Sequence, residues 1–172
     1  MTKIFIDGSQ GTTGLKIFDR LAKREDIELI TLPEELRKDT NARKEALNSA
    51  DIAFLCLPDA AAIEAVSLIE NDNTVVIDTS TAHRTNEGWA YGFPELSEEF
   101  ENKLKNSKRI AVPGCYASGF IALVKPLVDA GFVDSDICIA CHALSGYSGA
   151  GKNGIAQYED ENRDVLLDAP RE

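Results

Sequence analysis

The sequence feature that most constrains the fold is a turn with three evenly spaced glycines, Gly8, Gly11 and Gly14. The apolar segment 3–7 before it is typical of a short strand, and an apolar stripe with helical spacing follows over 15–22. Glycines in such a strand–turn–helix unit allow a tight turn and let backbone N–H groups approach an anion at the helix N-terminus. The unit predicts a site for the diphosphate of a dinucleotide cofactor. Its expected contact residues are Gly8, Ser9, Gln10, Gly11, Thr12, Thr13 and Gly14.

The order of the segments that follow supports this reading. The spacing Gly-x-x-Gly-x-x-Gly departs from the more common Gly-x-Gly-x-x-Gly, so a purely structural strand-to-helix turn remains an alternative. However, strand-like runs at 27–32, 51–58 and 74–78 alternate with helical segments at 41–49 and after Asp59. This alternation predicts an α/β fold, a Rossmann-like, doubly wound parallel sheet with helices on both faces.

Charge limits the range of partners. Lys and Arg number 18 against 29 Asp and Glu, a formal net charge of −11. Nucleic acids and anionic membranes bind clustered Lys and Arg, so both are disfavoured as partners, whereas a small anion held by one local basic group is compatible. No apolar run approaches the ~18 residues of a membrane span, and the amino-terminal strand is interrupted too early for a signal peptide. We therefore expect a cytoplasmic protein that acts on a small molecule.

Cys115 is the candidate nucleophile. It follows the strand-like segment 109–113 and Gly114, and it opens an apolar helix expected at about 116–130, which Pro126 should kink or end early. Unpaired N–H groups and the helix dipole at this position favour a thiolate, and the same N–H groups can stabilise an oxyanion. A buried cysteine that fills a tight corner is the structural alternative.

The other three cysteines have weaker cases. Cys56 and Cys138 lie in apolar runs and are expected in the core. Cys141 lies three residues after Cys138 in the segment 136–144, which we expect to form a long apolar strand. Alternation along a strand sends these two side chains to opposite faces, so we expect neither a redox pair nor a metal site there.

The end of the second strand indicates which cofactor is bound. Enzymes that use NAD usually place an acid there to hold the ribose hydroxyls. Here the segment 30–33 contains Thr31 and no acid, and Arg37 follows shortly. A hydroxyl and an arginine suit a 2′-phosphate better than a diol, so NADP is the predicted cofactor. A nucleophilic cysteine beside a nicotinamide implies that the thiol forms a covalent acyl intermediate and that hydride transfer accompanies it.

Five motifs occur in a fixed order along the chain. They are Gly8-x-x-Gly11-x-x-Gly14, Asp-Thr-Ser-Thr-Ala-His-Arg at 78–84, Tyr-Gly-Phe-Pro-Glu-Leu at 91–96, Pro-Gly-Cys-Tyr at 113–116 and Ser-Gly-Tyr-Ser-Gly-Ala-Gly-Lys at 145–152. Together they resemble the N-acetyl-gamma-glutamyl-phosphate reductase family in its shorter, type 2 form, with the aspartate-semialdehyde dehydrogenases as broader relatives. The resemblance implies NADPH-dependent reduction of N-acetyl-L-glutamyl 5-phosphate to N-acetyl-L-glutamate 5-semialdehyde, with release of phosphate, in arginine biosynthesis.

The resemblance also implies roles for individual residues. Cys115 would carry the acyl thioester. Arg84, whose N–H donors suit an anion, would contact the substrate phosphate, with a surface or domain-joining role as the alternative. The implied cofactor contacts near the nicotinamide are Ser145, Gly146, Ser148 and Gly149. Residues 1–114 would form the NAD(P)-binding domain and 115–172 the beginning of an α+β catalytic and dimerisation domain, through which family members form homo-oligomers.

The sequence departs from the family pattern in one respect. The family's acid/base histidine belongs to the substrate domain, beyond the 145–152 motif, but the two histidines here are His83 and His142, and each is more readily structural. The family's second domain also extends beyond the last residue of this chain, so the 172 residues alone are expected to turn over poorly or not at all. Two alternatives stay open: an aspartate-semialdehyde dehydrogenase-like activity, or a domain that binds NADPH without catalysis.

Overall fold

The computed structural model describes residues 1–134 and 136–162. The chain divides into two compact units, Met1–Cys141 and His142–Glu172. The first contains the sheet, and the second contains a 3₁₀ helix, η3 (Tyr147–Ala150), followed by helix α6 (Gly151–Glu159). Within the described ranges, no helix is long and apolar enough to cross a membrane.

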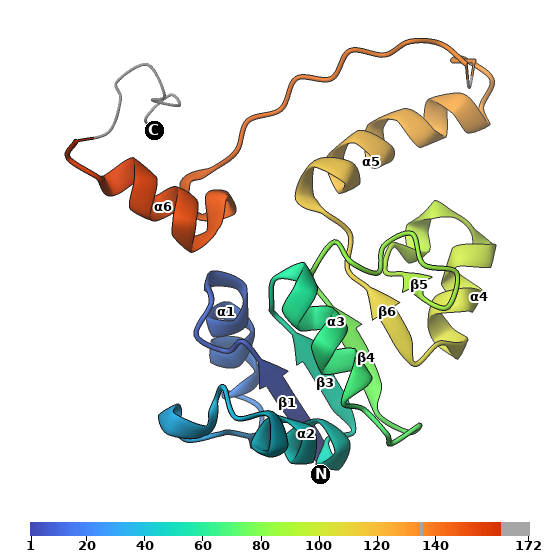
Figure 1. Cartoon of the computed structure of the whole chain (residues 1–172). Helices are drawn as coiled ribbons and strands as arrows, with labels where there is room; N and C mark the ends of the chain where they lie inside the picture. Colours follow the sequence, from blue (N-terminus) through green and yellow to red (C-terminus); the bar gives the residue numbers. More distant parts are fainter. Residues whose placement is uncertain (135, 163–172) are drawn as a thin grey trace. The chain divides into compact units, whose positions relative to one another are not determined.

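The unit Met1–Cys141 is built on a six-stranded sheet in which every neighbouring pair is parallel. The strands are β1 (Thr2–Asp7), β2 (Ile27–Ile30), β3 (Ile52–Leu55), β4 (Val75–Asp78), β5 (Ala90–Tyr91) and β6 (Arg109–Ala111). They lie in the order β2-β1-β3-β4-β6-β5, so the chain moves first to one side of β1 and then to the other. Figure 1 labels β1, β3, β4, β6 and β5 in this order across the sheet. The predicted doubly wound parallel sheet is confirmed. Sheets of this kind bind ligands at the carboxyl edge, where the strand order reverses.

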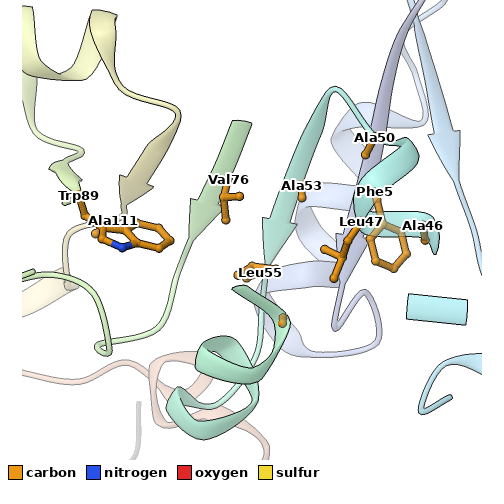
Figure 2. Packing of buried hydrophobic residues seen from close by; sticks show 10 residues of the cluster. Phe5, Ala46, Leu47, Ala50, Ala53, Leu55, Val76, Trp89 and Ala111 are labelled. Atoms are coloured by element: carbon orange, nitrogen blue, oxygen red, sulfur yellow. The ribbon is translucent and has the colours of Figure 1, made fainter. Parts of the chain in front are cut away.

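Helices α1 (Thr12–Leu21), α2 (Thr40–Ser49) and α3 (Asp59–Ser67) cover the two faces of this sheet. The remaining helices of this unit are α4 (Glu98–Asn106), α5 (Cys115–Asp129), which buries no residue, and the 3₁₀ helices η1 (Glu34–Leu36) and η2 (Pro94–Leu96). Alternation along β1 sends Ile4 and Ile6 to the face that α1 covers, and Phe5 to the face that α2 and α3 cover. Figure 2 shows the larger cluster, in which Phe5 and Leu47 pack together with Leu55 and Val76. Burial on both faces explains why these strands are continuous apolar runs.

Two expectations about the chain after β6 are wrong. The whole segment 136–144 is irregular and exposed, so it is not a strand and Cys138 is not a core thiol. A strand needs a neighbour for its backbone N–H and C=O groups, and no strand of the described residues pairs with this segment. Pro126 does not end α5 early, since the helix continues to Asp129, whereas the alternative expectation of a kink at Pro126 stays a prediction.

A buried ion-pair network ties α2 and α3 to the end of β1. Arg43 of α2 is 7% exposed, and its Nε and Nη2 donate to Oδ2 of Asp7 at 3.1 and 3.0 Å. Its Nη1 donates to Glu64 of α3 at 3.0 Å. Burial raises the pKa of the Asp7 carboxyl, and hydrogen bonds from Arg43 oppose part of that rise. Because Asp7 directly precedes Gly8, the network fixes the start of the glycine turn relative to two helices.

We expect Arg43→Met to lower the free energy of unfolding by about 3 kcal/mol, because it leaves Asp7 buried without its cation. Without Arg43, burial raises the pKa of Asp7 in the folded state further above its unfolded value. Stability linked to a raised folded pKa is present at low pH and is lost as the pH rises through that pKa, so the deficit should be larger at about pH 8 than at about pH 5. Urea unfolding at both pH values measures it, and a deficit independent of pH would contradict this account. The control Lys44→Ala removes an exposed ion pair from α2 and should cost less than about 0.5 kcal/mol.

Candidate active site

The glycine turn at the carboxyl end of β1 lies directly against the residue that follows β3. Gly8 has a φ of +85°, and a Cβ at this position would lie 2.3 Å from the carbonyl oxygen of Cys56. A Cβ on Gly14, in the first turn of α1, would lie 2.3 Å from the carbonyl oxygen of Gly8. Both positions therefore require glycine, one for the turn to close onto β3 and the other for α1 to begin beside the turn.

Gly11 stands in a different environment. It is the N-cap of α1 with a φ of −75°, and a Cβ there would make an ordinary contact, 3.4 Å from the carbonyl oxygen of Gly8. No side chain of the described residues caps α1, and its first turn carries no acidic residue, so its first N–H groups and the positive end of its dipole are available to an anion. The remaining predicted contact residues are half-buried or exposed around this N-terminus; they are Ser9, Gln10, Thr12 and Thr13.

Arg37 follows the strand that neighbours the glycine turn. β2 is paired with β1, so the carboxyl ends of these two strands lie side by side. After β2 the chain forms η1, and Arg37 is the residue at its C-terminal end. The Arg37 side chain is exposed and forms no ion pair with the parts of the chain that the structure describes. An exposed cation therefore lies on the connection that follows β2.

Cys115 is the first residue of α5, close after β6. Gly114 is the N-cap, and within the described ranges no side chain caps this helix. The backbone N–H and the hydroxyl of Ser118 both donate to the Gly114 carbonyl at 2.8 Å, while the N–H groups before Ser118 belong to the helix turn that has no internal acceptor. Cys115 is exposed, whereas Cys56 is partly buried, and burial raises the pKa of the Cys56 thiol to about 11. Cys115 is thus an exposed thiol beside helix N–H groups that are free to bind an oxyanion.

The glycine turn and Cys115 lie at one edge of the sheet. Since β1, β3, β4 and β6 are all parallel, their carboxyl ends meet at the same edge. That edge carries the turn at 8–14, the loop at 79–84 after β4, and Cys115 after β6. Residues that were singled out separately in the sequence are thus brought together by the parallel sheet. In the described chain, no group of three or more His, Cys, Asp and Glu residues is placed to hold a metal ion.

Arg84 joins the loop after β4 to the segment that precedes Cys115. Its Nε donates to the carbonyl oxygen of Val112 at 3.0 Å, and its Nη2 donates to that of Thr79 at 3.3 Å. Its Nη1 lies against Gly114, where a Cβ would be 2.7 Å away. Arg84 therefore has a joining role, and it leaves further N–H donors of its guanidinium beside the start of α5.

A buried cluster next to Arg84 was not identified from the sequence. Asp78, the last residue of β4, is fully buried, and its Oδ2 lies 2.7 Å from Nδ1 of His83 and accepts from the Ser80 hydroxyl at 2.6 Å. His83 is 7% exposed, and its ring stacks on Trp89 with centroids 4.1 Å apart. An acid at the end of an apolar strand, five residues before a histidine, was the available signal. The stacking depends on the path of the loop, which sequence spacing does not reveal.

The other predicted cofactor contacts belong to the second unit. Ser145 and Gly146 precede η3, while Ser148 and Gly149 lie within it, and all four residues are exposed. The N–H of Gly149 donates to the carbonyl of Gly146 at 2.9 Å, which closes the turn. The hydroxyl of Tyr147 is hydrogen-bonded to Glu159 at the end of α6. A contact between this turn and a cofactor stays a prediction.

Known families match most of the chain. The family model described as semialdehyde dehydrogenase, NAD binding domain, matches residues 32–104, and that of the semialdehyde dehydrogenase dimerisation domain matches 115–167. A curated relative, the N-acetyl-gamma-glutamyl-phosphate reductase of Chelativorans sp. (strain BNC1), is 55% identical over 163 residues, which are 95% of this chain and 53% of that protein. The chain spans about half the length of the curated relatives it matches.

Solved structures share the fold. The aspartate semialdehyde dehydrogenase of Francisella tularensis has a TM-score of 0.65 at 15% identity, covering 97% of this chain and 53% of that one. The enzyme of the same name from Candida albicans, crystallised with NADP, has a TM-score of 0.55 at 19% identity, covering 75% and 47%. Two adjoining domain models of one family match the chain over 32–104 and 115–167, so this chain belongs to the semialdehyde dehydrogenase family, and within the matched length it is similar to N-acetyl-gamma-glutamyl-phosphate reductases.

Proposed function

We propose that this chain is the cofactor-binding and nucleophile-bearing part of an NADPH-dependent reductase, which converts N-acetyl-L-glutamyl 5-phosphate into N-acetyl-L-glutamate 5-semialdehyde and phosphate in arginine biosynthesis. The observation that carries the proposal is an exposed Cys115 at the N-terminus of α5, on the sheet edge that also holds the glycine turn. The 55% identity to the Chelativorans reductase favours this substrate, because the aspartate semialdehyde dehydrogenases share only the fold. The proposal includes a cytoplasmic enzyme and, because 115–167 match a dimerisation domain, a homo-oligomer.

The cofactor of the proposal is NADPH. A Cβ on Gly8 or Gly14 would collide with backbone atoms, so the turn at 8–14 packs closely against its neighbours. The turn leads into the uncapped N-terminus of α1, whose N–H groups can bind a diphosphate. Arg37, exposed beyond β2, suits the 2′-phosphate. The Candida albicans structure with NADP shows that a protein of this fold binds that cofactor. The proposed contacts near the nicotinamide are Ser145, Gly146, Ser148 and Gly149.

In the proposed reaction, the Cys115 thiolate attacks the acyl carbon of the substrate. A sulfur–carbon bond forms, the carbon–oxygen bond to phosphate breaks as the tetrahedral oxyanion collapses, and a thioester remains. The first N–H groups of α5 stabilise that oxyanion, and the N–H donors of Arg84 that Val112 and Thr79 leave unused bind the departing phosphate. Bound NADPH supplies the hydride that reduces the thioester to the aldehyde and frees the thiolate.

We expect N-acetyl-L-glutamyl 5-phosphate, added without NADPH, to acylate Cys115 selectively, because this half-reaction uses groups that the chain contains. Mass spectrometry of the cysteine-bearing peptides measures the thioester. Cys115→Ser should abolish it, and Cys138→Ser, which removes another exposed thiol, should leave it unchanged. Equal modification of the three exposed cysteines would favour a domain that binds NADPH without catalysis. Faster acylation by aspartyl phosphate would favour the aspartate-semialdehyde dehydrogenase-like reading.

Substitution of the glycines should separate stability from cofactor binding. Gly14→Ala places a Cβ against the Gly8 carbonyl and should lower the free energy of unfolding by about 2 kcal/mol. Gly11→Ala meets only an ordinary contact and should cost less than about 1 kcal/mol, yet it should weaken NADPH binding about tenfold if the diphosphate rests on this backbone. Urea unfolding and a fluorescence titration of NADPH measure the two effects. Unchanged NADPH affinity in Gly11→Ala would argue for a purely structural turn.

Arg37→Gln should weaken NADPH binding about tenfold and leave NADH binding unchanged, because only NADPH carries the 2′-phosphate. The two dissociation constants can be measured by the same fluorescence titration. Arg20→Gln, in the last turn of α1, removes another exposed arginine and is the matched control, which should change neither constant. An equal loss of affinity for both nucleotides would show that Arg37 contributes only to the general electrostatic potential.

A further inference from the structure

The loop at 79–84 is hydrogen-bonded to the ends of three other elements. The Thr79 hydroxyl donates to the carbonyl of Leu55 at the end of β3 at 2.9 Å. The Thr81 N–H donates to the carboxylate of Asp59 at the start of α3, also at 2.9 Å. Arg84 then donates to Val112, just beyond β6. Beyond the ends of the strand ladders, this loop therefore adds links between the carboxyl ends of β3, β4 and β6.

Within this loop, His83 is held from two sides. Its Nδ1 lies 2.7 Å from Oδ2 of Asp78, which is fully buried, and its ring stacks on Trp89 with an interplanar angle of 15°. Its carbonyl accepts the N–H of Asn86 at 3.2 Å. Together these contacts fix His83, and with it the backbone of the adjoining Arg84, relative to the core of the sheet.

Arg84 in turn contacts the residues that precede α5. Its Nε donates a hydrogen bond to the Val112 carbonyl. Its Nη1 lies so close to Gly114 that a Cβ on Gly114 would be 2.7 Å from it. The positive charge is thus held against the residue that precedes Cys115. A fixed N-cap sets the direction of the first N–H groups of the helix, and with it the orientation of the Cys115 side chain at the helix start.

We infer that His83 is a positioning residue for the Cys115 thiol: anchored by Asp78 and Trp89, it holds Arg84 against Val112 and Gly114. The inference rests on the proposed function in taking Cys115 as the nucleophile. In this role His83 acts through Arg84; it need neither touch the substrate nor exchange a proton with it. The relevant contacts all lie within Met1–Cys141.

The test measures the rate at which iodoacetamide alkylates Cys115, relative to Cys138 and Cys141 in the same molecule. These two exposed thiols lie outside the contact network and serve as internal references. His83→Leu removes the donor to Asp78 and should lower the relative rate about fivefold. His83→Asn keeps an N–H donor and should restore most of the rate, while His142→Asn, which changes an exposed histidine in the other unit, should have no effect.

A double-mutant cycle shows whether His83 acts through Arg84. Arg84→Ala alone should lower the relative rate, and adding His83→Leu should lower it no further, since the intermediary is already absent. Circular dichroism and urea unfolding identify conditions in which each variant is folded, and His83→Gln replaces His83→Leu if that variant does not fold. A relative rate that is unchanged in the folded His83 variant, or losses that add fully in the double variant, would overturn the inference.

The readout needs neither NADPH nor acyl phosphate, so it separates this inference from the proposed function. If Cys115 reactivity depends on His83 and Arg84 but no thioester forms with N-acetyl-L-glutamyl 5-phosphate, the positioning role stands and the proposed substrate is wrong. If the thioester forms while the relative alkylation rate ignores His83, the proposed function stands and the positioning role is wrong.

Discussion

The parallel pairing of β1 with β3 is the constraint on which the carboxyl edge of the sheet depends, where the glycine turn lies. The ladder continues to the last residue of both strands, where Asp7 pairs with Leu55, and the N–H of Cys56 donates to the Asp7 carbonyl at 2.8 Å. The two loops therefore leave the sheet side by side, and the first residue after β1 meets the Cys56 carbonyl. Only a residue without a Cβ fits there, so glycine at position 8 follows from strand pairing. Arg43 holds the preceding Asp7 through two side-chain hydrogen bonds.

The same arrangement recurs at the other half of the sheet. β4 pairs with β6, and the N–H of Val112 donates to the carbonyl of Asp78 at 2.8 Å just past the end of the ladder. Beyond that point both strands are followed by loops without ladder pairing. Arg84 connects these loops by donating hydrogen bonds to the carbonyls of Thr79 and Val112. A planar guanidinium with donors on several sides suits this task, because it can bind two carbonyls and still present N–H groups to an anion. Structural and chemical roles for Arg84 are thus compatible.

Local pattern was sufficient for the features that depend on neighbouring residues. Apolar runs, glycine spacing and the strand–helix alternation led to the parallel sheet and placed Cys115 at the start of a helix. Pattern was insufficient where an outcome depends on a distant partner. The segment 136–144 is as apolar as a strand, yet no strand of the described residues pairs with it, and Cys138 is exposed as a result. Strand formation requires a neighbour, and composition does not supply one.

The sequence by itself determined the strand–helix alternation from β1 to β4, the glycine turn between β1 and α1, and the cysteine that begins α5, because tight turns and helix ends are encoded within a few residues. Only the tertiary structure decided that Asp78, His83 and Trp89 form one buried cluster, and that Arg84 reaches from the loop after β4 to the end of β6. Those contacts join residues up to 28 positions apart. Their formation depends on which strands pair and on the path of the loop between them, and no local preference of the chain specifies either.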